Sequence, residues 1–294
     1  MQPVFSRWLA LILGAAAALV MAELFLRGRD RRMILPPVAR APGQTTIVTL
    51  GDSITAGAPG DPAIAWPAVL GEHLRRNYPD VTWRIVNAGV SGDTAPLGYA
   101  RFERDVAAVG PQLVLIAFGL NDCDPVRYGM DRWLEADVPA GLAASYLWRA
   151  IVRRGQRLGR RLGWLSAPQP EPADSRQPRT SPQGFGDALD ALVAKTRLIG
   201  ARPVLLTMTP LAAAATEGVQ VRFDAYPVYN RIIGERAAAG GVAAIQLASG
   251  APGDAFEADG IHLTAAGQAW LAGDVFRQGE LAGIWAKLAQ EARR

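Results

Sequence analysis

Four short segments of the sequence carry side chains that could cooperate in nucleophilic catalysis. They are Gly51–Gly57, Asn87–Thr94, Gly119–Asp122 and Asp259–His262, and each follows a stretch that we expect to form a β-strand. Acyl transfer needs a nucleophile, a base that takes its proton, a group that orients the base, and donors for the developing oxyanion. The four segments together contain a candidate for each of these roles.

The candidate catalytic triad consists of Ser53, Asp259 and His262. Ser53 would be the nucleophile, and His262, one of only 2 histidines in the chain, would be the base. Asp259 precedes His262 by three residues and could hold the imidazole in the required tautomer. The oxyanion donors would be the backbone N–H groups of Ser53 and Gly92 and the side-chain amide of Asn121.

Each segment also has a purely structural explanation when it is taken alone. Gly-Asp-Ser is a common turn, and Asp-x-x-His often begins a helix with a capping aspartate. The presence of all four segments in this order, each after a strand, favours acyl transfer. Outside the triad, we expect Asp52 to hydrogen-bond within its turn and Asp122 and Asp124 to order their loop. We expect His73 to lie at the surface and Cys123 to be a small buried residue, since no basic group adjoins its thiol.

The elements that must position these residues are predicted from hydrophobic periodicity. Beyond residue 45, short β-branched apolar runs alternate with longer stretches of helical period, which indicates a parallel sheet covered by helices on both faces. Helices are expected over Ala65–Arg76 and from Ser181-Pro182 onward, because serine can cap a helix and proline fits its first turn. The predicted strands are Thr46–Leu50, Thr82–Asn87, Leu113–Phe118, Pro203–Met208 and Val242–Leu247.

In a doubly wound parallel sheet, ligands bind beyond the carboxyl ends of the strands, at the point where the strand order reverses. With strand order 2-1-3-4-5, Ser53 and Asn121 would flank this point, and Gly92 would lie beside them. Because the fifth strand is at the edge of the sheet, the loop Ala248–Ala258 must carry the histidine segment back over the crevice.

The four segments resemble the sequence blocks of the SGNH hydrolase superfamily, which includes the GDSL-type enzymes. Its name refers to a serine, a glycine, an asparagine and a histidine, which are found here as Ser53, Gly92, Asn121 and His262. The resemblance extends from about Thr45 to the C-terminus. The sequence Ala-Trp-Pro at positions 65–67 and the segment 87–94 are most similar to lysophospholipase and thioesterase-like members.

The resemblance implies a flavodoxin-like, three-layer α/β/α fold with a doubly wound parallel five-stranded sheet of order 2-1-3-4-5. It also implies a serine esterase that cleaves acyl esters of lipid or small-molecule type through an acyl-enzyme, with no cofactor. An O-acetylesterase or O-acetyltransferase of envelope carbohydrate would use the same triad and stays open, as does a non-catalytic membrane-bound binding protein. An α/β-hydrolase is not expected, because the sequence around Ser53 is Gly-x-Ser-x-Thr rather than Gly-x-Ser-x-Gly.

The composition limits the partners that we expect. The formal net charge is +4, and the arginine excess lies around 27–32 and 149–161, which fits an anionic membrane surface at least as well as nucleic acid. No aromatic residues interleave with the second arginine stretch, so we expect no nucleic-acid binding. A single cysteine allows no internal disulfide, and with 2 histidines we expect no metal site.

Residues 1–32 are predicted to be a membrane anchor or signal segment with a basic flank. The stretch Trp8–Ala22 is uncharged, and its apolar character continues to Leu26, which gives nearly the roughly 20 residues that span a bilayer. Val20-Met21-Ala22 resembles a cleavage site, so an anchor helix and a cleaved signal peptide both stay open. We expect a membrane-anchored or exported, extracytoplasmic protein, although the arginines after the segment favour the opposite orientation.

The rest of the chain is predicted to be a linker, 33–44, followed by one hydrolase domain, 45–294, with an insertion at about 126–182. Within the insertion, residues 147–165 combine leucines at helical spacing with many arginines. Such a basic helix could lie in a membrane interface or close over an acyl chain, or it could simply expose a solvated arginine face.

Overall fold

The structure is a computed structural model that describes residues 21, 44–57, 62–125, 177–212 and 217–293. The predicted apolar N-terminal helix, most of the predicted insertion and its basic helix lie outside these residues. From residue 44 onward, the described residues belong to one compact unit. None of the helices in the described part of the chain is both long enough and apolar enough to cross a bilayer.

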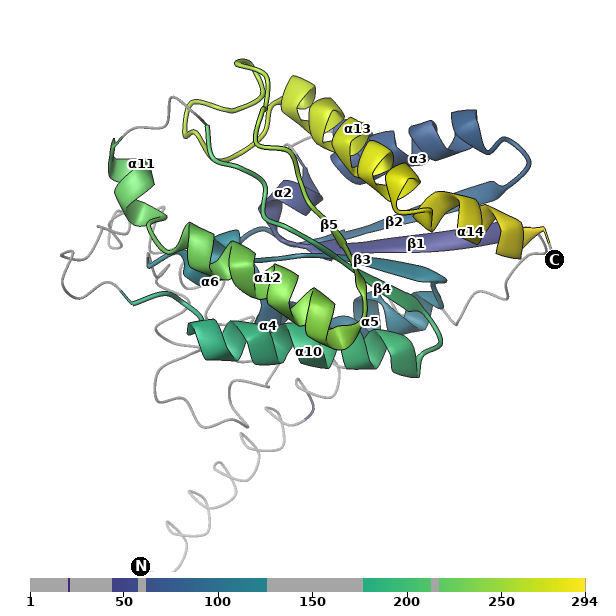
Figure 1. Cartoon of the computed structure of the whole chain (residues 1–294), viewed down its shortest axis with the longest axis horizontal. Coiled ribbons are helices and arrows are strands. Elements are labelled where there is room, and N and C mark those ends of the chain that lie inside the picture. The colour runs from purple at the N-terminus through teal and green to yellow at the C-terminus, as the bar shows by residue number, and fades with distance from the viewer. Residues whose placement is uncertain (1–20, 22–43, 58–61, 126–176, 213–216, 294) are drawn as a thin grey trace, which may run out of the picture. The chain divides into compact units, whose positions relative to one another are not determined.

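A five-stranded parallel sheet forms the centre of this unit (Figure 1). The strand order is β2-β1-β3-β4-β5, which confirms the predicted order. The alternation of apolar runs and helices therefore gave a correct prediction of the fold class. The strands are β1 (Gln44–Gly51), β2 (Thr82–Gly89), β3 (Leu113–Ala117), β4 (Arg202–Leu206) and β5 (Ala243–Ile245).

The register of β2, β1 and β3 brings the carboxyl ends of these three strands level with one another. Gly51 at the end of β1 pairs with Gly89 of β2 on one side and with Ala117 of β3 on the other. The loops that follow these strands therefore start at the same edge of the sheet. These are the loops that contain the serine, glycine and asparagine segments.

Some strand boundaries differ from the prediction. β1 starts at Gln44, the last residue of the predicted linker, because Thr82 of β2 provides it with a partner. β4 and β5 end two residues earlier than predicted. Beyond β5, side chains rather than the backbone carbonyls of β4 accept the N–H groups. The N–H of Leu247 donates to Thr207 Oγ1 at 2.8 Å, and the N–H of Ala248 donates to Asp274 Oδ2 at 2.7 Å.

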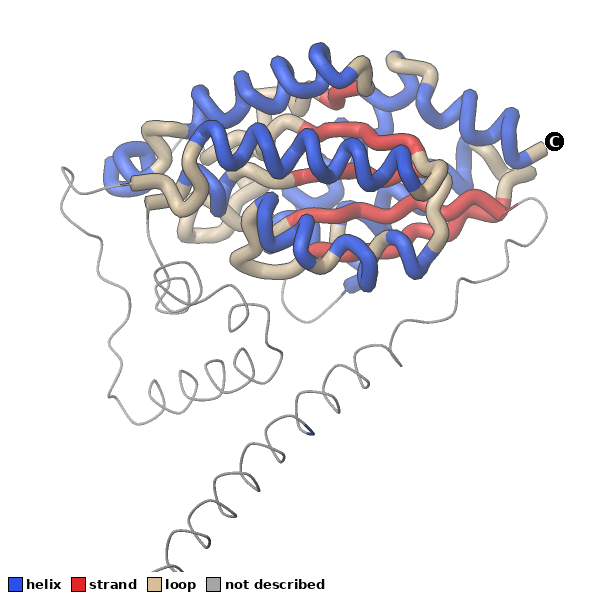
Figure 2. The backbone as a smooth tube through the Cα atoms, turned by 90° about the horizontal axis from the view of Figure 1, so that it is seen from below, coloured by secondary structure: helices blue, strands red, loops and turns tan. Residues whose placement is uncertain are grey.

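Helices cover both faces of the sheet, so that the strands form a middle layer between them (Figure 1), and Figure 2 shows the helices of one face lying in front of the strands. One group of helices, α3, α13 and α14, lies on one face, and α4, α5, α10 and α12 lie on the other (Figure 1). The helices are α2 (Ser53–Ala56), α3 (Trp66–Asn77), α4 (Ala95–Ala100), α5 (Phe102–Asp105), α6 (Leu120–Cys123), α10 (Pro182–Leu198), α11 (Glu217–Arg222), α12 (Tyr226–Gly240), α13 (Ala265–Leu281) and α14 (Ile284–Ala292), with short 3-10 helices at Pro62–Ile64 and Ala107–Val109.

The start of α10 agrees with the sequence prediction. Ser181 is the N-cap, its hydroxyl accepts the N–H of Gly184 at 3.1 Å, and Pro182 occupies the first turn. The apolar side chains of this helix, including Phe185 and Leu192, are buried against the sheet layer. Burial of one apolar face fixes the helix on the sheet and so places the residues that precede it beside the strand ends.

Candidate active site

Ser53 lies at the start of α2, directly after β1, in a turn whose backbone is tightly constrained. The carboxylate of Asp52 caps this short helix, because its Oδ1 accepts the N–H of Ile54 at 2.9 Å. A Cβ atom at Gly51 would collide with the side chain of Thr55 and the backbone oxygen of Ala117, so only glycine fits there. Asp52 is thus a hydrogen-bonding member of the turn, as predicted, and the turn presents the serine above the sheet edge.

The structure brings the three predicted triad residues together. His262 Nε2 lies 3.0 Å from Ser53 Oγ, and His262 Nδ1 lies 2.6 Å from Asp259 Oδ2. With Nδ1 donating to the carboxylate, Nε2 is left with a lone pair that can accept the serine proton. This geometry can generate a nucleophilic serine oxygen.

The loop between β5 and α13 carries the histidine back over the sheet edge, as the topology requires. Asp259 Oδ1 accepts the N–H groups of Ile261 and His262, both at 2.9 Å, which fixes the turn between them. Gly260 adopts a φ of 70°, which favours glycine. The N–H of Glu257 donates to the carbonyl of His262 at 2.8 Å, so the loop is held at both sides of the imidazole.

Asp259 remains ionised because its hydrogen bonds outweigh its burial. Burial acts to raise the pKa of Asp259, but the His262 ring and the N–H groups of Ile261 and His262 together lower it below its usual value. About half of each of the Asp259 and His262 side chains is exposed. The triad therefore faces solvent, where a substrate can reach it.

The three predicted oxyanion donors lie on the loops after β1, β2 and β3. Asn121 is in α6, and its Nδ2 lies 3.4 Å from Asp52 Oδ2, beside the serine turn. Gly92 follows β2 with a φ of 84°, and a Cβ atom at this position would meet nothing within 4 Å. Glycine is thus required at position 92 by its backbone conformation rather than by close packing.

An arginine that the sequence analysis did not select connects two of these donors. Arg179 Nη1 donates to Asn121 Oδ1 at 3.2 Å, and its Nη2 donates to the carbonyl oxygen of Gly92 at 3.0 Å. The residue is only 7% exposed. It lies near the C-terminal end of the predicted insertion, 126–182, and nothing in its spacing distinguishes it from the other arginines there.

Other polar residues near the asparagine segment have the ordering roles that we predicted. Asp122 accepts the N–H of Ala95 with both carboxylate oxygens at 3.1 Å, and Asp124 pairs with Arg222 of α11. Cys123 is buried, and burial raises the pKa of its thiol well above the usual range. Among the described residues, no three His, Cys, Asp or Glu side chains gather as a metal site would require.

His73 differs from its prediction as a surface residue. It is half-buried in α3, and its ring stacks on Phe276 of α13 with the ring centroids 5.3 Å apart. The reason is that α13 packs along α3 and covers this side of it. His73 therefore has a packing role and lies outside the triad.

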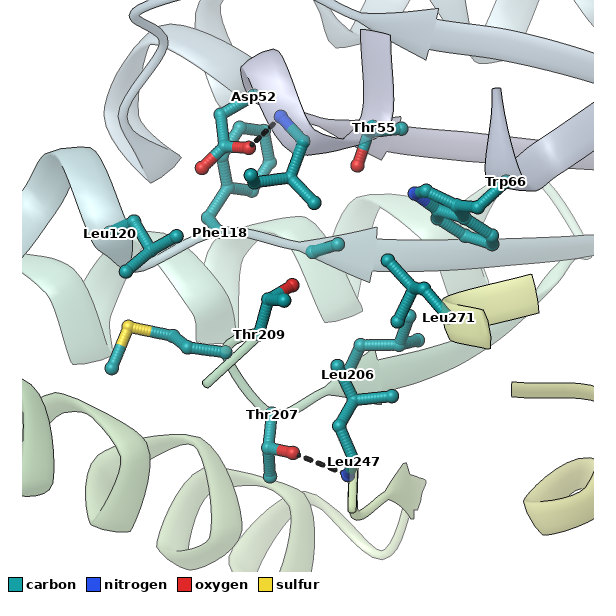
Figure 3. Close-up of a pocket in the computed structure, with 13 residues that line it drawn as sticks. Asp52, Thr55, Trp66, Phe118, Leu120, Leu206, Thr207, Thr209, Leu247 and Leu271 are labelled. Carbon is teal, nitrogen blue, oxygen red and sulfur yellow. Dashed lines mark hydrogen bonds between the residues drawn. The ribbon is translucent and has the colours of Figure 1, made fainter. Parts of the chain in front are cut away.

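A small cavity of about 20 Å³ lies beneath the serine turn (Figure 3). Asp52 and Thr55 line one side of it, and Thr207 and Thr209 line another. A space of this size holds about one water molecule rather than an acyl chain. Thr55 Oγ1 is buried without a hydrogen-bond partner, and a water in this cavity would satisfy it.

The chain resembles known proteins in both sequence and structure. The sequence matches the GDSL-like Lipase/Acylhydrolase family over residues 49–270. It is 37% identical over 102 residues to Esterase TesA of Pseudomonas aeruginosa, which covers 35% of this chain and 48% of that protein. It is 36% identical over 83 residues to Thioesterase 1/protease 1/lysophospholipase L1 of Escherichia coli, covering 28% and 38% of the two chains.

A third relative is the Acetylxylan esterase of Geobacillus stearothermophilus, with 33% identity over 105 residues, 32% of this chain and 42% of that protein. The matches thus span less than half the length of these curated relatives. Among solved structures, that of TesA has a TM-score of 0.52 and 23% identity and covers 81% of this chain and 99% of the other. The lipase/acylhydrolase from Enterococcus faecalis has a TM-score of 0.52 and 20% identity, covering 81% and 96%. At these identities, the structural matches establish a shared fold.

Proposed function

The chain belongs to the GDSL-like lipase/acylhydrolase family, and from this we propose that it hydrolyses carboxylic esters through an acyl-enzyme formed on Ser53. The observation that carries the proposal is the continuous hydrogen-bonded arrangement from Ser53 Oγ through the His262 ring to Asp259. Each atom in it has the donor or acceptor character that acyl transfer needs.

In the first half-reaction, His262 Nε2 takes the proton of Ser53 while Oγ attacks the ester carbonyl carbon. The bond from this carbon to the alcohol oxygen then breaks, and His262 returns the proton to the leaving alcohol. In the second half-reaction, His262 takes a proton from water, the hydroxide attacks the acyl-enzyme, and the serine recovers its proton as the acid leaves. Asp259 stabilises the imidazolium that forms in both halves.

The negative charge on the carbonyl oxygen develops beside the three strand ends. The N–H groups of Ser53 and Gly92 and the Nδ2 group of Asn121 are the donors that we assign to it. Such donors stabilise the transition state more than the bound ester, because the charge on the oxygen is fully developed only there.

We infer that the substrates are acyl esters of lipid or small-molecule type. The similarity to proteins described as an esterase and as a thioesterase and lysophospholipase supports this range. A second candidate is the removal of acetyl groups from carbohydrate, which the similarity to an acetylxylan esterase favours. Rates with nitrophenyl esters from acetate to palmitate, and with acetylated xylan, would separate the two, and adding a sugar acceptor would reveal transfer to carbohydrate in place of hydrolysis.

A fluorophosphonate probe tests the central proposal, because it reacts covalently with the activated serine of serine hydrolases and far more slowly with unactivated hydroxyl groups. The wild-type protein should be labelled and should hydrolyse nitrophenyl acetate or butyrate. Ser53→Ala should lose both the label and the turnover while its thermal unfolding stays unchanged, and His262→Ala should lose both as well. Wild-type turnover by Ser53→Ala would show that another residue is the nucleophile.

We also propose that residues 1–32 attach the protein to a membrane or direct its export, with the hydrolase domain on the extracytoplasmic side. The uncharged stretch Trp8–Ala22 supports this proposal. Fractionation of cells that express the full chain, followed by carbonate extraction, should leave the protein in the membrane pellet if the segment is an uncleaved anchor. A shortened mature N-terminus, read by mass spectrometry, would instead indicate a cleaved signal peptide.

A further inference from the structure

We propose that Arg179 is a positioning residue of the oxyanion hole, which holds Asn121 and Gly92 in the orientation that acyl transfer needs. This inference rests on the proposed esterase function and assigns a task to a residue outside the four family segments. One guanidinium group bridges the two donors, with bonds of 3.2 Å to Asn121 Oδ1 and 3.0 Å to the Gly92 carbonyl.

The backbone around Arg179 is itself anchored to the chain segment that contains Asn121. The N–H of Arg179 donates to the carbonyl of Asp124 at 3.1 Å, and the N–H of Thr180 donates to the carbonyl of Asp122 at 3.1 Å. Ser181 then caps α10, which is fixed on the sheet by its apolar face. The guanidinium is therefore presented from a rigid support, which is what a positioning group requires.

The chemistry of the contact fixes which way the Asn121 amide faces. A guanidinium only donates hydrogen bonds, so Arg179 can pair with Oδ1 and not with Nδ2. On the other side, Asp52 Oδ2 lies 3.4 Å from Nδ2 and is an acceptor when ionised. The amide is thus held between a donor and an acceptor, and a flip would place like groups against each other at both ends. Because Nδ2 carries two hydrogens, the bond to Asp52 leaves one for the substrate oxygen.

The second bond acts on the carbonyl of Gly92, within a turn that the N–H of Asp93 closes by donating to the carbonyl of Val90 at 3.1 Å. Glycine at a φ of 84° has many accessible conformations, and nothing packs where its side chain would be. Arg179 holds the Gly92 carbonyl, and the adjacent Asp93 is held by Arg101 at 2.5 Å. Both contacts lie on the C-terminal side of Gly92, and together they limit rotation of the backbone that presents its N–H to the oxyanion.

The test separates the geometry of the guanidinium from its charge. Arg179→Lys keeps the positive charge but cannot donate to both acceptors in the same fork, and Arg179→Ala removes both. We expect kcat on nitrophenyl butyrate to fall about 10- to 100-fold in Arg179→Lys and further in Arg179→Ala, with KM within about threefold of the wild type. Guanidinium chloride at millimolar concentration should restore part of kcat in Arg179→Ala and leave the wild type unaffected.

A double-mutant cycle with Asn121→Ala tests whether Arg179 acts through the Asn121 amide. If the role of Arg179 were purely structural, its substitution would reduce kcat by the same factor with and without the amide. If Arg179 acts through the amide, Arg179→Lys should reduce kcat much less in the Asn121→Ala background than in the wild type. The control is Arg236→Gln, which removes the ion pair between Arg236 of α12 and Asp190 of α10, the helix that follows Arg179, and should keep wild-type kcat.

The outcomes distinguish this inference from the proposed function. Absence of fluorophosphonate labelling and of ester turnover in the wild type would overturn the function. An active wild type together with Arg179→Lys at wild-type kcat, or with fully additive effects in the cycle, would overturn the role of Arg179 alone. Thermal unfolding of each variant identifies loss of folding, and Arg179→Lys, the milder change, carries the test if Arg179→Ala does not fold.

Discussion

Arg101 Nη2 donates a hydrogen bond of 2.9 Å to the carbonyl oxygen of Gly51, the last residue of β1. Nη1 of the same side chain donates to the carbonyl of Ala88 in β2 at 2.8 Å, and its Nε pairs with Asp93 at 2.5 Å. One guanidinium, only 9% exposed as a side chain, therefore joins the ends of two strands to the loop that contains Gly92.

We predict that Arg101→Met lowers the free energy of unfolding by about 3–5 kcal/mol, because it removes the buried donor that joins the part-buried carboxylate of Asp93 to the carbonyls of Gly51 and Ala88. Urea unfolding followed by fluorescence measures this change. The control is Arg76→Met, because Arg76 pairs with Glu72 on the exposed face of α3 and its loss should change the free energy by less than about 0.5 kcal/mol. Equal effects of the two substitutions would contradict a special role for Arg101.

Asp259→Asn should lower kcat/KM roughly 10²- to 10⁴-fold without unfolding the protein. An asparagine can still accept the N–H groups of Ile261 and His262, so the turn persists. Its amide would donate to His262 Nδ1, however, and the ring would then carry its hydrogen on Nε2, where it must accept the serine proton. Asp254→Asn, an exposed change in the same loop, is the matched control and should keep wild-type kcat/KM.

Asn121→Ala should reduce kcat by about 10²- to 10³-fold, roughly 3 kcal/mol of transition-state stabilisation, because it removes one oxyanion donor. KM should change far less, since the uncharged carbonyl of the bound ester gains little from this donor. Steady-state kinetics on a nitrophenyl ester give both values. A rise in KM at constant kcat would show that Asn121 binds the substrate and does not stabilise the oxyanion.

The fold and the triad could be predicted from the sequence because both depend on residue type and local pattern. The apolar runs of β1 and β3 have the composition of strands buried on both faces, and they are almost entirely buried. Ser53 and His262 belong to residue types that perform nucleophilic catalysis, and they follow recognisable segments. The geometry then places them 3.0 Å apart, as the predicted topology requires.

Arg101 and Arg179 could not be predicted, because their roles depend on contacts between distant parts of the chain. Arg101 is 50 residues from the Gly51 carbonyl that it binds, and Arg179 is 87 residues from Gly92. An arginine has no local pattern that marks it as buried, and this chain has many. The early end of β5 has the same kind of cause, since the acceptor for Ala248 is the side chain of Asp274, 26 residues away.

The contact between β2 and α2 yields a prediction on the placement of Ser53. A Cβ atom at Gly89 would overlap the backbone of Thr55 and Ala56 in α2, and the Asn87 amide donates to the Thr55 carbonyl at 2.8 Å in the same region. We predict that Gly89→Ala pushes α2 away from β2, lowers the free energy of unfolding by about 1–3 kcal/mol and lowers kcat at least tenfold.

The control for Gly89→Ala is Gly273→Ala in α13, where an added Cβ would meet nothing within 4 Å. Alanine has the higher helix propensity, so this change should stabilise the protein by up to about 1 kcal/mol and leave kcat unchanged. Thermal unfolding and ester kinetics on the two purified variants make the comparison. Wild-type kcat in Gly89→Ala would show that α2 can shift without moving Ser53 out of reach of His262.

Two buried acids near the asparagine segment predict how stability depends on pH. Burial raises the pKa of Asp122 to about 7, against the lowering effect of its bonds from Thr180 and the N–H of Ala95. Burial likewise raises the pKa of Asp52 to about 6. In the unfolded chain, both groups return to the ordinary value of 3.8. Between pH 4 and 7, roughly, the folded protein therefore binds more protons than the unfolded chain, and its free energy of unfolding falls as the pH rises.

Asp122→Asn removes one of these two titrating groups, and the asparagine oxygen can still accept the N–H of Ala95. Relative to the wild type, the variant should therefore become more stable by about 1–2 kcal/mol between pH 5 and pH 8. Urea unfolding at both pH values measures the difference, and Asp187→Asn, an exposed change on α10, should follow the wild type at both. If the wild type and Asp122→Asn showed parallel pH dependence, Asp122 would have to be ionised in the folded protein already at pH 5. Its burial would then be offset by the hydrogen bonds that it accepts.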